Sequence, residues 1–126
     1  MLNDAQPVCF VLTADMARAR SFYSDTLGLT ETGADPYAVS YDLAGTMLRL
    51  TKVDSHTASP HTVLGWHVVD LAATIDALMA KGVVFAIYEG FDQDMRGVWT
   101  DPGSGTRIAW FHDPEGNNLS LTQFGG

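Results

Sequence analysis

Two histidines lie six residues apart near the middle of the chain, His61 and His67. Imidazole nitrogens bind divalent metals, and they also exchange protons near neutral pH. In an extended strand every second side chain points to the same face, so both histidines and Val63 would share one face. Two interpretations stay open: a metal site built on this pair, or an exposed His61 beside a His67 that lines a cavity.

Two other residue pairs have side chains suited to catalysis, but their spacing is a weaker indication of a site. Ser120 with His67 has the residue types of a nucleophile and its base, but no third group or oxyanion site accompanies them. Glu89 with Asp92 or Asp94 resembles an acid–base carboxylate pair, although the same residues fit a solvated turn. The surrounding segment 88–99 is rich in glycine and aromatic residues, so we interpret it as a lid or ligand rim. Trp99 is its best candidate for stacking on a flat ligand.

Composition excludes several classes of function. The chain has 126 residues, with 7 Lys and Arg against 15 Asp and Glu, which gives a net charge of −8. This acidity argues against nucleic acid and anionic membranes as partners. There is no Gly-x-Gly-x-x-Gly, no phosphate-binding Gly-x-x-x-x-Gly-Lys and no Cys-x-x-Cys. One cysteine, no long apolar run and no signal-peptide pattern lead us to expect a cytoplasmic protein.

The elements that must position these residues come from an internal repeat. An offset of 55 superimposes 8–22 on 63–77, and each copy predicts a strand, a capping Asp15 or Asp70, and a helix. Those helices are predicted over 15–28 and 70–82. An offset of 71 aligns Asp42–Thr51 with Asp113–Thr122, where Asp-x-x-Gly predicts a hairpin turn. The chain is therefore predicted to be strand–helix–strand–strand–strand, twice.

With this layout, the segments Phe22-Tyr23-x-x-x-Leu27-Gly28-Leu29 and Asp113-Pro-Glu-Gly-Asn117 resemble the vicinal oxygen chelate superfamily of glyoxalases, bleomycin-resistance proteins and extradiol dioxygenases. The resemblance spans about 8–124. It implies an α+β fold in which two tandem βαβββ modules form curved mixed sheets around a cavity, with helices outside. We expect a single domain over 1–126, with module one at about 7–53, a linker at about 54–60 and module two at about 61–124.

The resemblance also implies where a metal would be bound. Family enzymes take ligands from the first and last strands of each module, and the repeat carries these positions onto Val8, Arg49, Val63 and Ser120. Valine has no lone pair, arginine repels a cation and serine is a weak donor. We therefore expect no metal and no other cofactor.

Strand alternation predicts the lining of the cavity instead. The candidate ligand-binding residues are Phe10, Leu12, Met47, Arg49, His67, Trp99 and Ser120. They indicate a metal-independent protein that forms a homodimer and sequesters a small organic molecule, such as an aromatic or antibiotic-like compound. The alternative is a metal-free or atypical glyoxalase-family lyase, isomerase or dioxygenase-like enzyme that uses His67 as its acid–base group.

Overall fold

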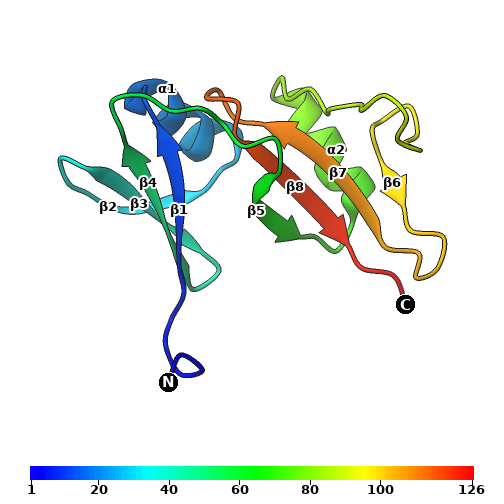
Figure 1. The fold of residues 1–126 in the computed structure, drawn as a ribbon, viewed down its shortest axis with the longest axis horizontal. Coiled ribbons are helices and arrows are strands. Elements are labelled where there is room, and N and C mark those ends of the chain that lie inside the picture. The colour runs from blue at the N-terminus through cyan, green and yellow to red at the C-terminus, as the bar shows by residue number, and fades with distance from the viewer. The chain divides into compact units, whose positions relative to one another are not determined.

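The computed structural model describes all 126 residues, which divide into two compact units, Met1–Thr57 and Ala58–Gly126. Each unit contains a strand, a helix and three further strands, and each forms its own mixed sheet (Figure 1). The prediction of an α+β fold made of two tandem βαβββ modules is confirmed. No helix is long and apolar enough to span a membrane.

Unit 1 is built on one four-stranded sheet in the order β1-β4-β3-β2. Strand β1 is parallel to β4, and the remaining pairs are antiparallel. The helical segment follows β1 and ends in a π-helical turn, η1. The elements of the unit are β1 (Val8–Thr13), α1 (Met16–Ser21), η1 (Phe22–Thr26), β2 (Thr30–Ala34), β3 (Ala38–Leu43) and β4 (Thr46–Lys52).

Unit 2 repeats this topology with the order β5-β8-β7-β6. Its outer strand β6 has only two residues, and an eighteen-residue connection, 81–98, precedes it. The elements of the unit are β5 (Thr62–His67), α2 (Leu71–Ala80), β6 (Trp99–Thr100), β7 (Arg107–His112) and β8 (Asn118–Gln123).

Local capping explains where both helices begin. The carboxylate of Asp15 accepts the backbone N–H of Arg18, and that of Asp70 accepts the N–H of Ala73. Each aspartate thereby satisfies an amide that has no partner within its helix. Both predicted helices are confirmed, with observed helical ranges of 16–26 and 71–80.

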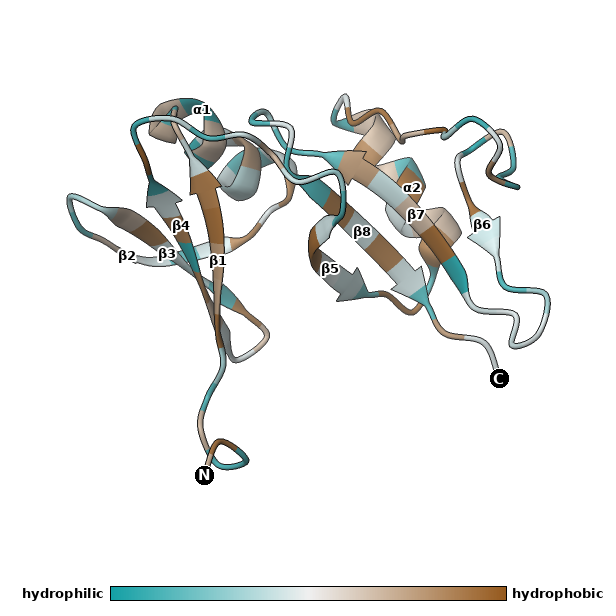
Figure 2. Cartoon of the chain, viewed as in Figure 1, coloured by the Kyte–Doolittle hydropathy of each residue, from teal (hydrophilic) through white to brown (hydrophobic).

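The core of each unit lies between its helix and one face of its sheet. Leu48 and Leu50 in unit 1, like Leu119 and Phe111 in unit 2, have no exposed surface. Figure 2 shows β8 banded between apolar and hydrophilic residues, because its leucines alternate with Ser120 and Thr122. Alternation of this kind places the leucines on the buried face of the sheet and the polar residues on the opposite, open face, where Ser120 is itself only 7% exposed.

Candidate functional site

The open face of unit 1 is set by the parallel pairing of β1 with β4. This register aligns Val8 with Met47, Phe10 with Arg49 and Leu12 with Thr51. The four predicted residues of this unit therefore lie on one sheet face. Phe10 is 59% exposed, and Val8 and Met47 are each 43% exposed. Apolar side chains thus form an accessible surface around the single guanidinium.

Arg49 has a carboxylate partner within its own unit. Its Nη2 lies 3.5 Å from Oδ2 of Asp35, and both side chains are partly exposed. Oδ1 of Asp35 accepts the backbone N–H groups of Tyr37 (2.7 Å) and Ala38 (2.9 Å). These amides, and then Arg49, lower the pKa of the Asp35 carboxyl. The carboxylate holds one arm of the guanidinium and leaves its remaining N–H groups for other acceptors.

The open face of unit 2 carries the predicted His67, which is exposed, and the predicted Ser120, which is buried at 7% exposure. Ser120 pairs with Gly65 on one side and with Trp110 on the other, and His67 pairs with Thr122. The His67 ring is exposed and lies edge-on to Phe124, with centroids 5.0 Å apart. The imidazole can therefore meet a ligand, but it has no orienting carboxylate.

A bulge changes which residue stands at the start of β5. The pairing with β8 passes from Thr62 opposite Asn118 directly to Leu64 opposite Leu119. Val63 is the extra residue in this pairing, and it is 44% exposed, just as Gly65 and His67 on the open face are exposed. Thr62 takes the place opposite Asn118, and its hydroxyl donates to Asn118 Oδ1 at 3.1 Å.

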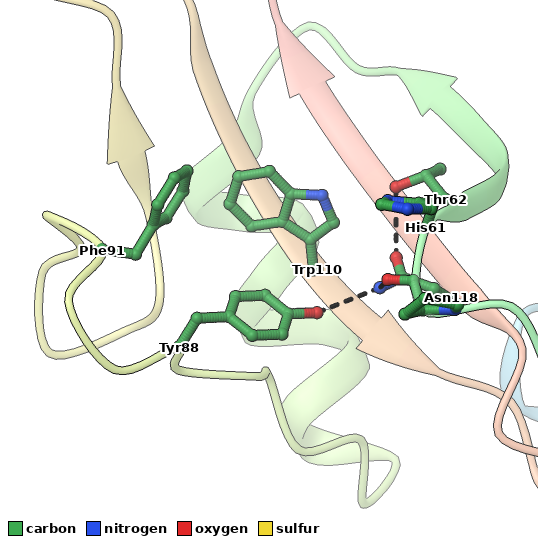
Figure 3. Close-up of a pocket in the computed structure, with 7 residues that line it drawn as sticks. His61, Thr62, Tyr88, Phe91, Trp110 and Asn118 are labelled. Atoms are coloured by element: carbon green, nitrogen blue, oxygen red, sulfur yellow. Dashed lines mark hydrogen bonds between the residues drawn. The ribbon is translucent and has the colours of Figure 1, made fainter.

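A pocket of about 240 Å³ opens beside this bulge. Three aromatic rings make one side of it, and small polar groups make the other (Figure 3). It is lined by Pro60, His61, Thr62, Tyr88, Phe91, Trp110 and Asn118.

The three rings pack at right angles to one another. Trp110 meets Tyr88 at a centroid distance of 6.0 Å and Phe91 at 5.5 Å, both edge-to-face. Trp99 stacks on Phe91 from outside the pocket, at 5.9 Å. Edge-to-face packing is a favourable aromatic geometry, so these contacts help to hold the three rings in place.

The polar side of the pocket is organised by Asn118, which is only 3% exposed. Its Oδ1 accepts from Thr62, and its Nδ2 donates to the Pro60 carbonyl (3.2 Å) and to the Tyr88 hydroxyl oxygen (3.0 Å). Both hydrogens of the amide are therefore used within the protein and none is left to donate to a ligand. Its function in the pocket is to hold the phenol of Tyr88 in place.

The connection 81–98 is fixed by the side chain of Gln93. Its Oε1 accepts the N–H of Tyr88 (2.7 Å), and its Nε2 donates to the carbonyls of Ala86 (3.0 Å) and Gly97 (2.7 Å). The N–H of Ala86 also donates to the Trp110 carbonyl of β7. These bonds attach the loop to the sheet and set Tyr88 above it.

The residues do not fit the metal centre of the related enzymes. No group of three or more His, Cys, Asp or Glu side chains is placed to hold a metal ion. The carried-over positions are Val8, Arg49, Val63 and Ser120, and Thr62, which the bulge brings in, is another weak neutral donor.

None of the seven predicted ligand-binding residues lines this pocket. Four lie on the open face of unit 1, while His67 and Ser120 lie on that of unit 2, and Trp99 supports Phe91 from behind. Tyr88 and Phe91 fall within the segment 88–99 that was interpreted as a rim. Alternation along 107–112 would have placed Trp110 on the face of Ser120, but no sequence pattern indicated Thr62.

Comparisons with known proteins agree with this architecture. The family model of the Glyoxalase/Bleomycin resistance protein/Dioxygenase superfamily matches residues 6–121. A superfamily member from Sphaerobacter thermophilus is 21% identical, with a TM-score of 0.73 and coverage of 98% of this chain and 99% of that one. No curated protein matches the chain.

Two further solved structures resemble the chain in fold. Lactoylglutathione lyase from Agrobacterium tumefaciens is 17% identical with a TM-score of 0.72, and the fosfomycin resistance protein FosX from Listeria monocytogenes is 11% identical with a TM-score of 0.73. Each alignment covers 95% of this chain and 93% of the other. At these identities the likeness concerns the fold alone.

Proposed function

The chain belongs to the glyoxalase/bleomycin resistance protein/dioxygenase superfamily, and from this premise we propose that it is a metal-independent protein that binds a small organic molecule. The molecule is held on the open faces of its sheets and is sequestered rather than converted. Phe10, Leu12 and Met47 provide apolar contact, and Arg49 provides a planar cation for an oxygen-rich group of the ligand.

The observation that carries this proposal is the combination of exposed apolar side chains with unsuitable metal donors on the same faces. Val8, Phe10, Met47 and Val63 are each more than 40% exposed on the first and last strands of their modules. Within unit 1, Val8, Phe10 and Met47 lie on one face of the sheet, and an exposed apolar surface of this kind is a common mark of a binding site. The donor positions on these strands carry valine, arginine and serine, so binding there uses packing and hydrogen bonds instead of coordination.

Ligand capture by the intact protein tests the proposal. Freshly purified chain is incubated with an extract of small metabolites or a library of one- and two-ring compounds, and retained molecules are identified by native mass spectrometry. We expect stoichiometric retention that survives treatment with a chelator. Retention that requires added Zn²⁺, Ni²⁺, Mn²⁺ or Fe²⁺ would contradict metal independence.

Turnover separates binding from catalysis. Each retained compound is incubated with the protein at catalytic ratios, and we expect it to be recovered unchanged. If the compound is converted, and if the His67→Gln variant no longer converts it, the protein is an acid–base enzyme and the proposal is wrong.

We also propose that the protein is a homodimer. Light scattering at micromolar concentration that shows a monomer would contradict this.

A further inference from the structure

The pocket between Trp110 and Asn118 directs two hydrogen-bond donors toward an incoming molecule, the Tyr88 hydroxyl and the Trp110 indole N–H. The Tyr88 hydroxyl oxygen already accepts from Asn118 Nδ2, so its own proton is directed elsewhere. The Trp110 indole N–H is a donor and has no protein partner. Figure 3 shows this nitrogen on the ring edge that faces Thr62, on the same side as the Tyr88 hydroxyl. Both protons therefore lie at the polar side of the pocket.

No charged side chain balances these donors. The lining contains no Asp, Glu, Lys or Arg, its one titratable imidazole is the exposed His61, and the chain as a whole carries a net charge of −8. An anionic ligand would meet a repulsive overall field with no Lys or Arg beside it. A cationic ligand would meet the Trp110 N–H and the Tyr88 O–H, whose hydrogens carry a partial positive charge and point toward it. The remaining match is a neutral molecule with an oxygen acceptor.

The apolar side and the volume define the body of that molecule. The rings of Tyr88, Phe91 and Trp110 are held by edge-to-face contacts, and Gln93 fixes the backbone that carries Tyr88. A cavity of roughly 150 Å³ accommodates benzene, and pockets for drug-sized ligands span roughly 300–1,000 Å³. A pocket of about 240 Å³ therefore fits one substituted ring.

From these observations we infer that the pocket lined by Tyr88, Phe91 and Trp110 binds a neutral, single-ring aromatic compound through a carbonyl-type oxygen. The oxygen accepts from the Tyr88 hydroxyl and the Trp110 indole N–H, and the ring packs on the aromatic wall. Asn118 and Gln93 are positioning residues in this arrangement. The inference rests on the proposed small-molecule function and names the chemical class that this part of the protein recognises.

Four planar probes with nine heavy atoms each test the inference on the full chain. Acetophenone has the neutral acceptor, α-methylstyrene replaces it with a methylene group, benzoate is the anion and benzamidinium is the cation. Affinities are measured by two-dimensional NMR titration at millimolar probe concentrations, and the Trp110 indole resonance is assigned from Trp110→Phe. We expect acetophenone to bind about threefold to tenfold more tightly than each other probe, and to shift the Trp110 N–H signal.

Variants of Tyr88 and Trp110 then test whether these two donors cause the preference for acetophenone. Tyr88→Phe keeps the ring and removes the hydroxyl, so the preference for acetophenone over α-methylstyrene should fall by about twofold to tenfold. Trp110→Phe should act in the same direction. Tyr37→Phe removes a phenol hydroxyl from an exposed residue of unit 1, and it should leave all four affinities unchanged.

The inference is overturned by any result other than preferred binding of acetophenone that depends on Tyr88 and Trp110. Equal binding of acetophenone and α-methylstyrene would show that the pocket does not recognise a hydrogen-bond acceptor. Preferred binding of benzamidinium would show that it is a cation site. No binding of acetophenone at millimolar concentration would also overturn it. These outcomes leave the proposed function standing as long as the intact protein retains other compounds, whereas a chain that retains nothing contradicts the proposed function itself.

Discussion

The two units share a topology but differ in the connection between helix and outer strand. In unit 1 three residues, 27–29, link η1 to the five-residue strand β2. In unit 2 eighteen residues, 81–98, link α2 to the two-residue strand β6. The longer connection supplies Tyr88 and Phe91, which form the aromatic pocket of unit 2 together with Trp110 of β7, whereas the open face of unit 1 has exposed apolar side chains and one ion pair. Two modules of the same topology thus differ in their surfaces because a loop and a strand bulge differ between them.

The largest expected effect concerns the stability of the two cores. Phe111→Ala in unit 2 and Leu48→Ala in unit 1 each remove a side chain with no exposed surface. We expect Phe111→Ala to lower the free energy of unfolding by about 3–5 kcal/mol and Leu48→Ala by about 2–5 kcal/mol. Thermal unfolding followed by calorimetry and circular dichroism measures both.

These two variants also test whether the two units unfold together as a single cooperative domain, which the chain length predicts. Both variants should lower the midpoint of one shared unfolding transition. A scan in which Phe111→Ala lowers one of two separate transitions, and Leu48→Ala lowers the other, would show two independently stable units and would contradict the prediction of a single domain.

The next effect concerns the cation of unit 1. Arg49→Met keeps much of the apolar volume and removes the charge, so the affinity for the compound that the intact protein retains should fall about tenfold to a hundredfold. Isothermal titration measures the change. Arg18→Met, on the exposed part of α1, is the matched control and should change affinity little. Unchanged affinity in Arg49→Met would restrict Arg49 to its ion pair with Asp35.

A pair of glycines sharpens the comparison between the loops. Gly97 of unit 2 and Gly45 of unit 1 both have positive φ, +85° and +97°. A Cβ at Gly97 would lie 3.0 Å from the Ala86 carbonyl oxygen, while a Cβ at Gly45 meets nothing within 4 Å. Gly45→Ala should therefore cost about 1–2 kcal/mol of stability from backbone strain alone, and Gly97→Ala should cost more.

The same pair separates stability from binding. Gly97→Ala should also weaken acetophenone binding, because the Ala86 and Gly97 carbonyls are the acceptors that hold Gln93. Gly45→Ala should leave that affinity unchanged, since its turn lies in unit 1. Equal loss of affinity in both variants would show that general destabilisation, and not the shape of the loop, controls the pocket.

The smallest effect is a pH dependence confined to unit 1. Hydrogen bonding from Arg20 holds the pKa of the Glu31 carboxyl below its usual value. A lowered folded pKa gives stability that is present above about pH 4.3 and is lost as the pH falls through the folded value. Glu31→Gln should flatten this part of the profile of unfolding midpoint against pH. An unchanged slope would mean that the exposed pair contributes nothing measurable.

The sequence by itself determined the repeated architecture of this protein. Asp15 and Asp70 marked the helix starts, the Asp-x-x-Gly turns marked both hairpins, and alternating leucines marked the buried face of β4 and β8. These features depend on local periods and on hydrogen bonds between residues close in the chain, so they can be read without the fold. The shared face of Phe10, Met47 and Arg49 followed from the same alternation.

Only the tertiary structure decided the pocket. The bulge that replaces Val63 with Thr62 opposite Asn118 depends on how two strands 56 residues apart adjust to each other. The connection 81–98 has no periodicity, and its shape comes from the three hydrogen bonds of Gln93 together with the contact of Tyr88 with Asn118, 30 residues away. Such links form only once the sheet has brought distant segments together, because a local pattern carries no information about its partners.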